Sequence, residues 1–190
     1  MSRIDARRDS RHPLRVRPGR SDDVPALTAI YNHYVVNSHV TFDTQPFTPE
    51  QRLADWFVQF DAASGPYRLL VAEVGEGEDR GQVVGYAAGT RFRPKPAYRT
   101  SIETCVYLDP EWVGRGVGRY VYGALMGLLD SMPDVHRAYA GVALPNDASQ
   151  RLHEGVGFRP VGVLREVGFK FGRFYNVAWY ERVCSVGNSR

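Results

Sequence analysis

A glycine-rich turn at residues 114–119 is the segment whose residue types and spacing most directly indicate chemistry. It reads Gly-Arg-Gly-Val-Gly-Arg and lies between an apolar stretch that ends at Leu108 and an apolar helical pattern. Glycine allows the backbone to approach a ligand without an intervening Cβ atom. The free N–H groups of the helix that follows converge on one place, and Arg115 and Arg119 add positive charge. The pattern predicts binding of an anion such as a pyrophosphate, and a tight structural turn is the alternative.

The spacing of the glycines excludes two other phosphate-binding motifs. Gly114, Gly116 and Gly118 alternate with single residues, whereas the dinucleotide-binding fingerprint reads Gly-x-Gly-x-x-Gly. No Gly-Lys-Ser/Thr sequence follows, so the turn is not a P-loop either.

Two ionisable side chains are candidates for proton transfer. Glu103 is the one acidic residue in the stretch Ser-Ile-Glu-Thr-Cys-Val-Tyr-Leu at 101–108. Partial desolvation in such a strand raises the pKa of a carboxylate, which suits a general base; a solvent-facing charge is the alternative. His153 follows Asn146 in a helical stretch, and its pKa range can serve an acid or a base. A lone histidine is, however, more often structural.

The elements that position these residues can be traced from hydrophobic periodicity and capping signals. Strands are expected at 13–17, 67–74, 82–91, 101–108, 136–144, 160–170 and 175–184. Helices are expected to begin at the caps Ser21 and Thr48, and to occupy 115–130 and 146–157. This order predicts a mixed α/β sheet that is antiparallel early and contains a strand–helix–strand crossover near the end.

Length and charge indicate a single globular domain without a nucleic-acid partner. The chain has 190 residues, of which 43% are hydrophobic and 24% charged, as in ordinary globular proteins. Seven arginines against Asp5 and Asp9 give residues 1–20 a charge of +5; because the whole chain carries +3, residues 21–190 carry −2. A nucleic-acid groove would place its basic stripe on the folded body. We therefore expect a poorly ordered basic tail at 1–12, one domain at 13–184 and a C-terminal tail at 185–190.

The sequence also bears on location and metal content. No stretch approaches the roughly 18 apolar residues of a membrane span, and the arginine-rich N-terminus lacks the apolar region of a secretory signal. We expect a cytoplasmic protein with no membrane partner. Cys105 and Cys184 are too few for a disulfide framework or a cysteine metal cluster. We expect buried thiols and no metal.

Four separated motifs resemble the GNAT acetyltransferases, and in particular their phosphinothricin acetyltransferase branch. The turn is similar to the family's pyrophosphate loop, Gln/Arg-x-x-Gly-x-Gly/Ala. Gly116 and Gly118 match its last two fixed positions, whereas Val113 stands where Gln or Arg is expected. The other three motifs are Ile-Tyr-Asn-His-Tyr at 30–34, Ala-Leu-Pro-Asn-Asp-Ala-Ser at 143–149 and Leu-Arg-Glu-Val-Gly-Phe-Lys-Phe-Gly-Arg at 164–173. The resemblance covers roughly residues 14–183.

The resemblance implies an acetyl-CoA-dependent N-acetyltransferase, often a homodimer. Its fold would be GNAT-like, with a mixed, mostly antiparallel central sheet of about seven strands flanked by about four helices. Glu103 occupies the position of the branch's proposed catalytic base, and His153 stands near the place where many relatives have a tyrosine that protonates the leaving thiolate. The implied cofactor-binding residues are Val106, Tyr107, Leu108, Gly114, Arg115, Gly116, Val117, Gly118, Arg119 and Asn146.

The implied acceptor pocket combines aromatic and cationic side chains, namely Phe42, Arg93, Lys95, Tyr98 and Tyr107. Arg93 and Lys95 are suited to hold a carboxylate or a phosphinate-like anion. Lys95 stands where the herbicide-detoxifying members are expected to have arginine, and an ammonium cannot copy the bidentate fork of a guanidinium.

The leading hypothesis is direct transfer of acetyl from acetyl-CoA to the amine of a small amino-acid-like substrate, with Glu103 as general base. Phosphinothricin, methionine sulfone, methionine sulfoximine and ordinary metabolites are the candidate acceptors. A protein or peptide N-acetyltransferase is one alternative, although a peptide needs an open groove and the cationic 93–95 loop disfavours it. A non-catalytic acyl-CoA-binding sensor is the other, and the retained Glu103 argues against it.

Overall fold

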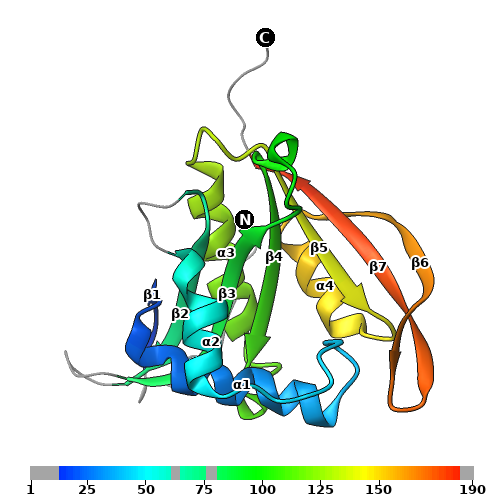
Figure 1. Cartoon of the computed structure of the whole chain (residues 1–190). Helices are drawn as coiled ribbons and strands as arrows, with labels where there is room; N and C mark the ends of the chain where they lie inside the picture. The colour runs from blue at the N-terminus through cyan, green and yellow to red at the C-terminus, as the bar shows by residue number, and fades with distance from the viewer. Residues whose placement is uncertain (1–12, 61–64, 76–80, 185–190) are drawn as a thin grey trace.

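The computed structural model describes residues 13–60, 65–75 and 81–184, so the expected tails and most of the turn at 75–81 lie outside the described residues. Its seven strands form one sheet in the order β1-β2-β3-β4-β5-β7-β6, in which only the pairing of β4 with β5 is parallel (Figure 1). The strands are β1 (Leu14–Pro18), β2 (Arg68–Val74), β3 (Gln82–Arg91), β4 (Ser101–Leu108), β5 (Arg137–Ala143), β6 (Arg159–Lys170) and β7 (Arg173–Val183). The α-helices are α1 (Val24–Asn37), α2 (Pro49–Asp55), α3 (Val117–Asp130) and α4 (Asp147–Gly155). The predicted mixed, mostly antiparallel sheet is confirmed.

The start of the first helix differs from the sequence prediction. Ser21 was expected to cap it, but η1 (Ser21–Asp23) is a short 3-10 turn and α1 begins at Val24. The Asp23 carboxylate accepts a hydrogen bond from the backbone N–H of Arg20 at 2.7 Å and pairs with the guanidinium of Arg17 at 2.7 Å. The ion pair between Arg17 of β1 and Asp23 therefore fixes where α1 begins. The hydrophobic periodicity of the helix does not reveal this ion pair.

The second helix begins as its capping box predicts. The Gln51 N–H donates to Thr48 Oγ1 at 3.2 Å, and the Thr48 N–H donates to Gln51 Oε1 at 2.8 Å. Pro49 occupies the first helical position, where its missing N–H costs nothing.

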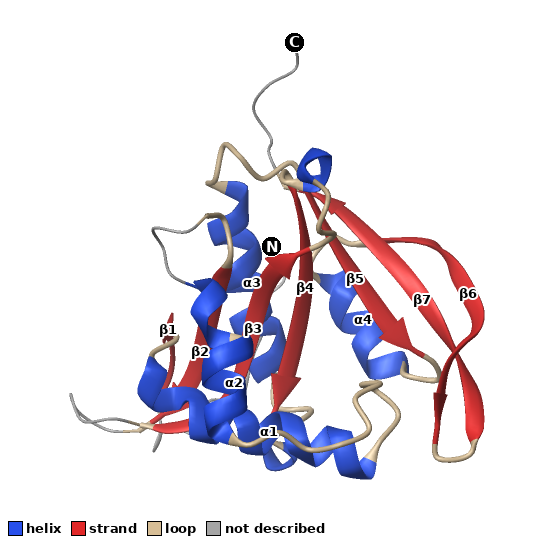
Figure 2. Ribbon diagram, viewed as in Figure 1, coloured by secondary structure: helices blue, strands red, loops and turns tan. Residues whose placement is uncertain are grey.

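Helices cover both faces of the sheet, and Figure 2 shows α1 and α2 over one face with α3 and α4 over the other. Side chains alternate between the two faces of a strand. In β2, Leu70 and Ala72 therefore pack into the core beneath α3, while Leu69 and Val71 pack toward α1. The result is a three-layer α/β arrangement. No helix among the described residues is long and apolar enough to cross a membrane.

The pairing between β4 and β5 is short, and the site is built where it ends. Only Ser101, Ile102 and Glu103 pair with β5, whereas β3 pairs with β4 as far as Leu108. Beyond Glu103 the two strands diverge into a V, which is visible in Figure 1. The β4–β5 ladder therefore does not extend to residues 104–108. Ligands bind in such places, at the carboxyl ends of parallel strands.

Candidate functional site

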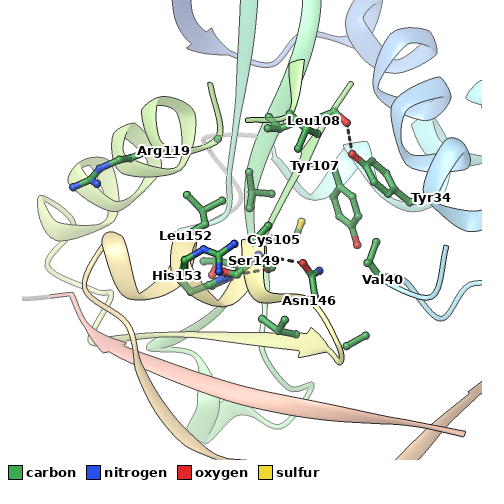
Figure 3. Close-up of a pocket in the computed structure, with 18 of the residues that line it drawn as sticks. Tyr34, Val40, Cys105, Tyr107, Leu108, Arg119, Asn146, Ser149, Leu152 and His153 are labelled. Atoms are coloured by element: carbon green, nitrogen blue, oxygen red, sulfur yellow. Dashed lines mark hydrogen bonds between the residues drawn. The ribbon is translucent and has the colours of Figure 1, made fainter. Parts of the chain in front are cut away.

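A cavity of about 460 Å³ lies in the split between β4 and β5; we call it the cofactor cavity (Figure 3). Eight of the ten predicted cofactor-binding residues line it: Val106, Tyr107, Leu108, Gly114, Gly116, Gly118, Arg119 and Asn146. The other two do not. The guanidinium of Arg115 lies 5.1 Å from the centre of the Trp112 ring, and the Val117 side chain is buried in the core. Of Val117, only the backbone remains to face an anion.

The glycine-rich turn has a backbone that other residues adopt poorly. Gly114 and Gly116 have φ values of +79° and +84°, a region that disfavours residues with a Cβ atom. Gly116 caps α3, and the first intrahelical bond runs from the Tyr120 N–H to the Gly116 carbonyl at 3.1 Å. The N–H groups of residues 117–119 thus have no partner within the helix. They emerge beside Arg119, so the turn combines free donors with a positive charge.

Gly118 is required for a different reason. A Cβ atom there would lie 3.2 Å from Leu152 and 3.3 Å from Leu108, closer than most carbon contacts. Glycine at 118 therefore lets α3 approach the end of β4 and α4 closely, which closes the inner wall of the cofactor cavity.

Asn146 and Tyr34 fix two further walls of the cofactor cavity. Asn146 caps α4, where its Oδ1 accepts the Ser149 N–H at 3.1 Å, as Figure 3 shows. This cap uses only the oxygen of the Asn146 amide. Tyr34 lines the cavity as well, and its hydroxyl donates to the Leu108 carbonyl at 2.7 Å. This bond ties the end of β4 to α1.

A second cavity, of about 400 Å³, lies on the α1 and α2 side of the sheet; we call it the acceptor cavity. Because strand side chains alternate, Glu103, Cys105 and Tyr107 of β4 all face it. Tyr31 of α1, Asp43 of the loop between α1 and α2, Arg52 of α2 and Trp56, which follows α2, also line it. Four residues line both cavities: Thr104, Cys105, Tyr107 and Gly141. The two cavities therefore meet where β4 separates from β5.

Glu103 lies in the acceptor cavity with its side chain 36% exposed. Burial raises the pKa of Glu103 above the usual carboxyl range, and the nearby Arg93 guanidinium partly offsets this increase in pKa. The pair is loose, because Arg93 Nη1 lies 3.7 Å from Glu103 Oε2 and the Arg93 side chain is half exposed. A carboxylate with a raised pKa is a better proton acceptor than one in water.

The other ionisable groups of the acceptor cavity differ from Glu103. Burial raises the pKa of the Tyr31, Tyr86 and Tyr107 phenols, and it raises the pKa of the Cys105 thiol to about 12. These four groups therefore keep their protons near neutral pH. The Asp43 carboxylate accepts a hydrogen bond from the Tyr31 hydroxyl.

His153 lines the cofactor cavity but is held by its neighbours. Its Nδ1–H donates to the Ser149 carbonyl at 2.7 Å, and its ring lies between 5.1 and 5.8 Å from the rings of Tyr122, Phe158 and Tyr180. Burial lowers the pKa of His153. A lowered pKa makes the protonated ring rarer, which disfavours the predicted role of His153 as an acid. The ring contacts pack this residue of α4 against Tyr122, Phe158 and Tyr180.

The predicted acceptor residues are only partly brought together. Tyr107 lines both cavities and Arg93 lies beside Glu103. Lys95 and Tyr98 are exposed around η3 (Pro96–Tyr98) and do not line the acceptor cavity. Phe42 packs instead against Gly168, where an added Cβ atom would lie 2.2 Å from its ring.

Most residues of the acceptor cavity, among them Asp43, Arg52 and Trp56, were not predicted as functional. Asp43 lies in an irregular loop, and Arg52 was not singled out in its helix. Trp56 and Tyr31 line this cavity as well. One signal was present, because Arg52 and Trp56 are four residues apart and so share one side of the helical stretch. The described residues contain no group of three His, Cys, Asp or Glu side chains placed to hold a metal ion.

Known proteins similar to the chain share one activity. A family profile described as an acetyltransferase (GNAT) domain matches residues 16–179. A phosphinothricin N-acetyltransferase of Streptomyces coelicolor is 52% identical over 169 residues, covering 89% of this chain and 95% of that protein. An L-methionine sulfoximine/L-methionine sulfone acetyltransferase of Salmonella typhimurium is 32% identical, covering 84% and 88%. A solved phosphinothricin acetyltransferase of the GNAT superfamily from Sinorhizobium meliloti, in complex with acetyl-CoA, matches with a TM-score of 0.83 at 28% identity, covering 93% of this chain and 91% of that one.

Proposed function

The chain belongs to the GNAT acetyltransferase family and is an acetyl-CoA-dependent N-acetyltransferase, and we propose that its acceptor is the amine of a small amino-acid-like molecule. The observation that carries this proposal is the meeting of the two cavities at Thr104, Cys105, Tyr107 and Gly141. Two ligands that enter from opposite faces of the sheet would touch only there. Such a geometry supports a complex in which both substrates are bound at once.

The cofactor cavity fits the parts of acetyl-CoA by their chemistry. The turn at 114–119 offers free N–H groups and the Arg119 cation to the pyrophosphate. Residues 106–108 offer backbone groups to the pantetheine amides in the manner of an added strand. The Asn146 amide lines the same cavity. When bound, acetyl-CoA supplies the acetyl thioester.

Glu103 is proposed as the general base. An ammonium group must lose a proton before its nitrogen becomes a nucleophile, and Glu103 offers a carboxylate with a raised pKa in the acceptor cavity. Cys105 lies at the junction, but its thiol stays protonated because its pKa is about 12. Since the thiolate is the nucleophilic form, an acetyl-cysteine intermediate is disfavoured. Transfer would pass directly to the amine.

The size of the acceptor cavity and the named relatives support a small acceptor. A volume of about 400 Å³ suits a small ligand better than a folded peptide segment. The relatives are named for phosphinothricin and for methionine sulfoximine and methionine sulfone, all compact amino acids with an oxidised side-chain end. We propose acceptors of this kind for the chain.

A thiol-release assay with acetyl-CoA tests the proposal. The panel contains phosphinothricin, methionine sulfone, methionine sulfoximine, the common amino acids and a few peptides. Turnover on one small amine, with peptides inactive, is the expected result. No turnover on any small amine, with acetyl-CoA binding shown by calorimetry, would contradict the proposal.

We further propose that the chain forms a homodimer through β6. This strand is the edge of the sheet, and Figure 1 shows the β6–β7 hairpin on the outer side of the molecule. Five apolar side chains of β6 are between 48% and 59% exposed: Val161, Val163, Leu164, Val167 and Phe169. An exposed apolar edge strand is a template for association unless something covers it. A second copy offers the matching surface.

A further inference from the structure

Arg52 is a buried cation in the acceptor cavity. Its side chain extends from α2, whose backbone the capping box at Thr48 sets, and the residue is only 7% exposed. The guanidinium carbon lies 3.8 Å from the centre of the Trp56 ring and 4.6 Å from that of Tyr31. The guanidinium therefore lies over both aromatic rings, at cation–π distance. The N–H groups lie in the guanidinium plane and stay available at its edge.

The hydrogen-bonding capacity of Arg52 is largely unused. Its Nη2 makes one long hydrogen bond, to the Tyr86 hydroxyl at 3.4 Å, and its buried Nε has no partner. Among the described residues, no carboxylate lies within 4.0 Å of this guanidinium. A buried guanidinium with free in-plane donors is suited to an oxyanion, which its fork binds with two parallel hydrogen bonds.

We propose that Arg52 binds an anionic oxo group of the acceptor, a carboxylate or a phosphinate, and so directs the ammonium of the same molecule toward Glu103. The inference rests on the proposed function and adds to it the group that recognises the acceptor. Arg52 contacts Tyr86 of β3, and Glu103 pairs with Thr90 of the same strand. Tyr86 and Thr90 share one face and lie about 13 Å apart along β3. Arg52 and Glu103 both line this one cavity, so a small zwitterion can present its anion to the cation and its ammonium to the base.

The sequence pointed to other cations for this task, and their environments are less suited to it. Arg93 is 48% exposed and already faces Glu103 at 3.7 Å, and Lys95 is exposed outside the cavity lining. An exposed cation gains little from an anion, because water screens the attraction. Arg52 is shielded from water, so its attraction to an oxyanion is stronger.

Steady-state kinetics of the full chain with two Arg52 variants test this inference. Arg52→Met keeps the length and packing of the side chain without its charge, and Arg52→Lys keeps the charge without the fork. With phosphinothricin as acceptor, which carries both a carboxylate and a phosphinate, Arg52→Met is expected to raise the acceptor KM roughly 10- to 100-fold, the range of hydrogen bonds to a charged group. Arg52→Lys is expected to raise the acceptor KM less than Arg52→Met does. The KM for acetyl-CoA and the unfolding midpoint stay near the wild-type values.

The α-carboxamides of methionine sulfone and of phosphinothricin show which oxo group is bound. If the carboxylate is bound, Arg52→Met has no further effect on either amide. If the phosphinate is bound, the effect persists on phosphinothricin amide and is absent from methionine sulfone and its amide, which carry no side-chain anion. An equal loss on the acids and on both amides would overturn the inference, because it would show that Arg52 only supports packing.

Acceptor binding, measured by calorimetry without acetyl-CoA, separates this inference from the proposed function. Wild-type binding of methionine sulfone or phosphinothricin that Arg52→Met abolishes supports the inference even if no turnover is seen. Wild-type turnover with an acceptor KM that Arg52→Met leaves unchanged contradicts the inference alone. Absence of both binding and turnover contradicts both.

Discussion

Glu103 owes its proposed role to its surroundings. The carboxylate faces a partly closed cavity, and burial raises its pKa while the Arg93 guanidinium opposes the increase in pKa. The phenols and the thiol around it keep their protons, so they can donate hydrogen bonds but do not accept a proton from an ammonium. The balance between burial and one loose ion pair therefore sets the pH at which the base works.

The Arg93–Glu103 pair gives a pH prediction. The base must be ionised, so kcat/KM falls as the pH drops through the Glu103 pKa, which lies above the usual carboxyl value. Arg93→Gln removes a cation that lowers this pKa, so the acidic limb of the kcat/KM profile moves to higher pH. Arg93→Lys keeps the charge and leaves the limb near its wild-type position. An acidic limb that stays in place in Arg93→Gln would show that another group controls it.

Sequence reasoning located the residues on regular elements and missed those that depend on long-range contacts. Glu103 and Gly116 lie on a strand and a turn whose patterns are local. Asp43 reaches the acceptor cavity from an irregular loop, and Arg52 reaches it by contacting Tyr86, 34 positions away. Neither contact leaves a local pattern in the sequence. Phe42 shows the reverse case: it was predicted in the acceptor pocket, but its ring lies next to Gly168 and does not line the acceptor cavity.

At the scale of elements, the β4–turn–α3 unit is the part most fully specified by sequence. The strand Ser101–Leu108 has the predicted bounds, and the helix begins two residues later than predicted because Gly116 caps it. The divergence of β4 from β5 was not predictable, since it depends on where a parallel ladder ends. That divergence creates the cofactor cavity. Local sequence patterns therefore identified residues that line the cavity but did not predict its shape.

Gly116 provides a test of this unit. Alanine at this position is strained at a φ of +84°, at a cost of about 1–2 kcal/mol, and the strain distorts the N–H groups that face the pyrophosphate. Gly116→Ala is therefore expected to weaken acetyl-CoA binding about 10-fold or more, measured by calorimetry. The matched control is Gly123→Ala within α3, where an added Cβ atom meets nothing within 4 Å. It should stabilise the fold by about 0.5–1 kcal/mol and leave affinity unchanged. Wild-type affinity in Gly116→Ala would remove the turn from the cofactor site.

For the whole molecule, the exposed β6 edge predicts the oligomeric state. Val161 and Val163 are more than half exposed on this strand. The double variant Val161→Glu, Val163→Glu places charges on the proposed interface and is expected to convert a dimer into a monomer of 21.4 kDa, measured by light scattering after size-exclusion chromatography. Val58→Glu is the control, because Val58 is 60% exposed on a different element, η2 (Phe57–Phe60). A wild-type monomer at micromolar concentration, or a double variant that stays dimeric, would contradict the proposal.

The measurement that tests the central claim most directly compares Glu103→Gln with Asp43→Asn, the two carboxylates of the acceptor cavity. Each variant is assayed for acetyl-CoA binding by calorimetry and for acetyl transfer across pH. Glu103→Gln is predicted to bind acetyl-CoA as the wild type does and to lose turnover about 10²- to 10⁴-fold. Asp43→Asn is predicted to keep the acidic limb of the pH profile, with any loss confined to the acceptor KM. Wild-type turnover in Glu103→Gln, with the acidic limb lost in Asp43→Asn instead, would assign the base to Asp43 and contradict the proposed mechanism.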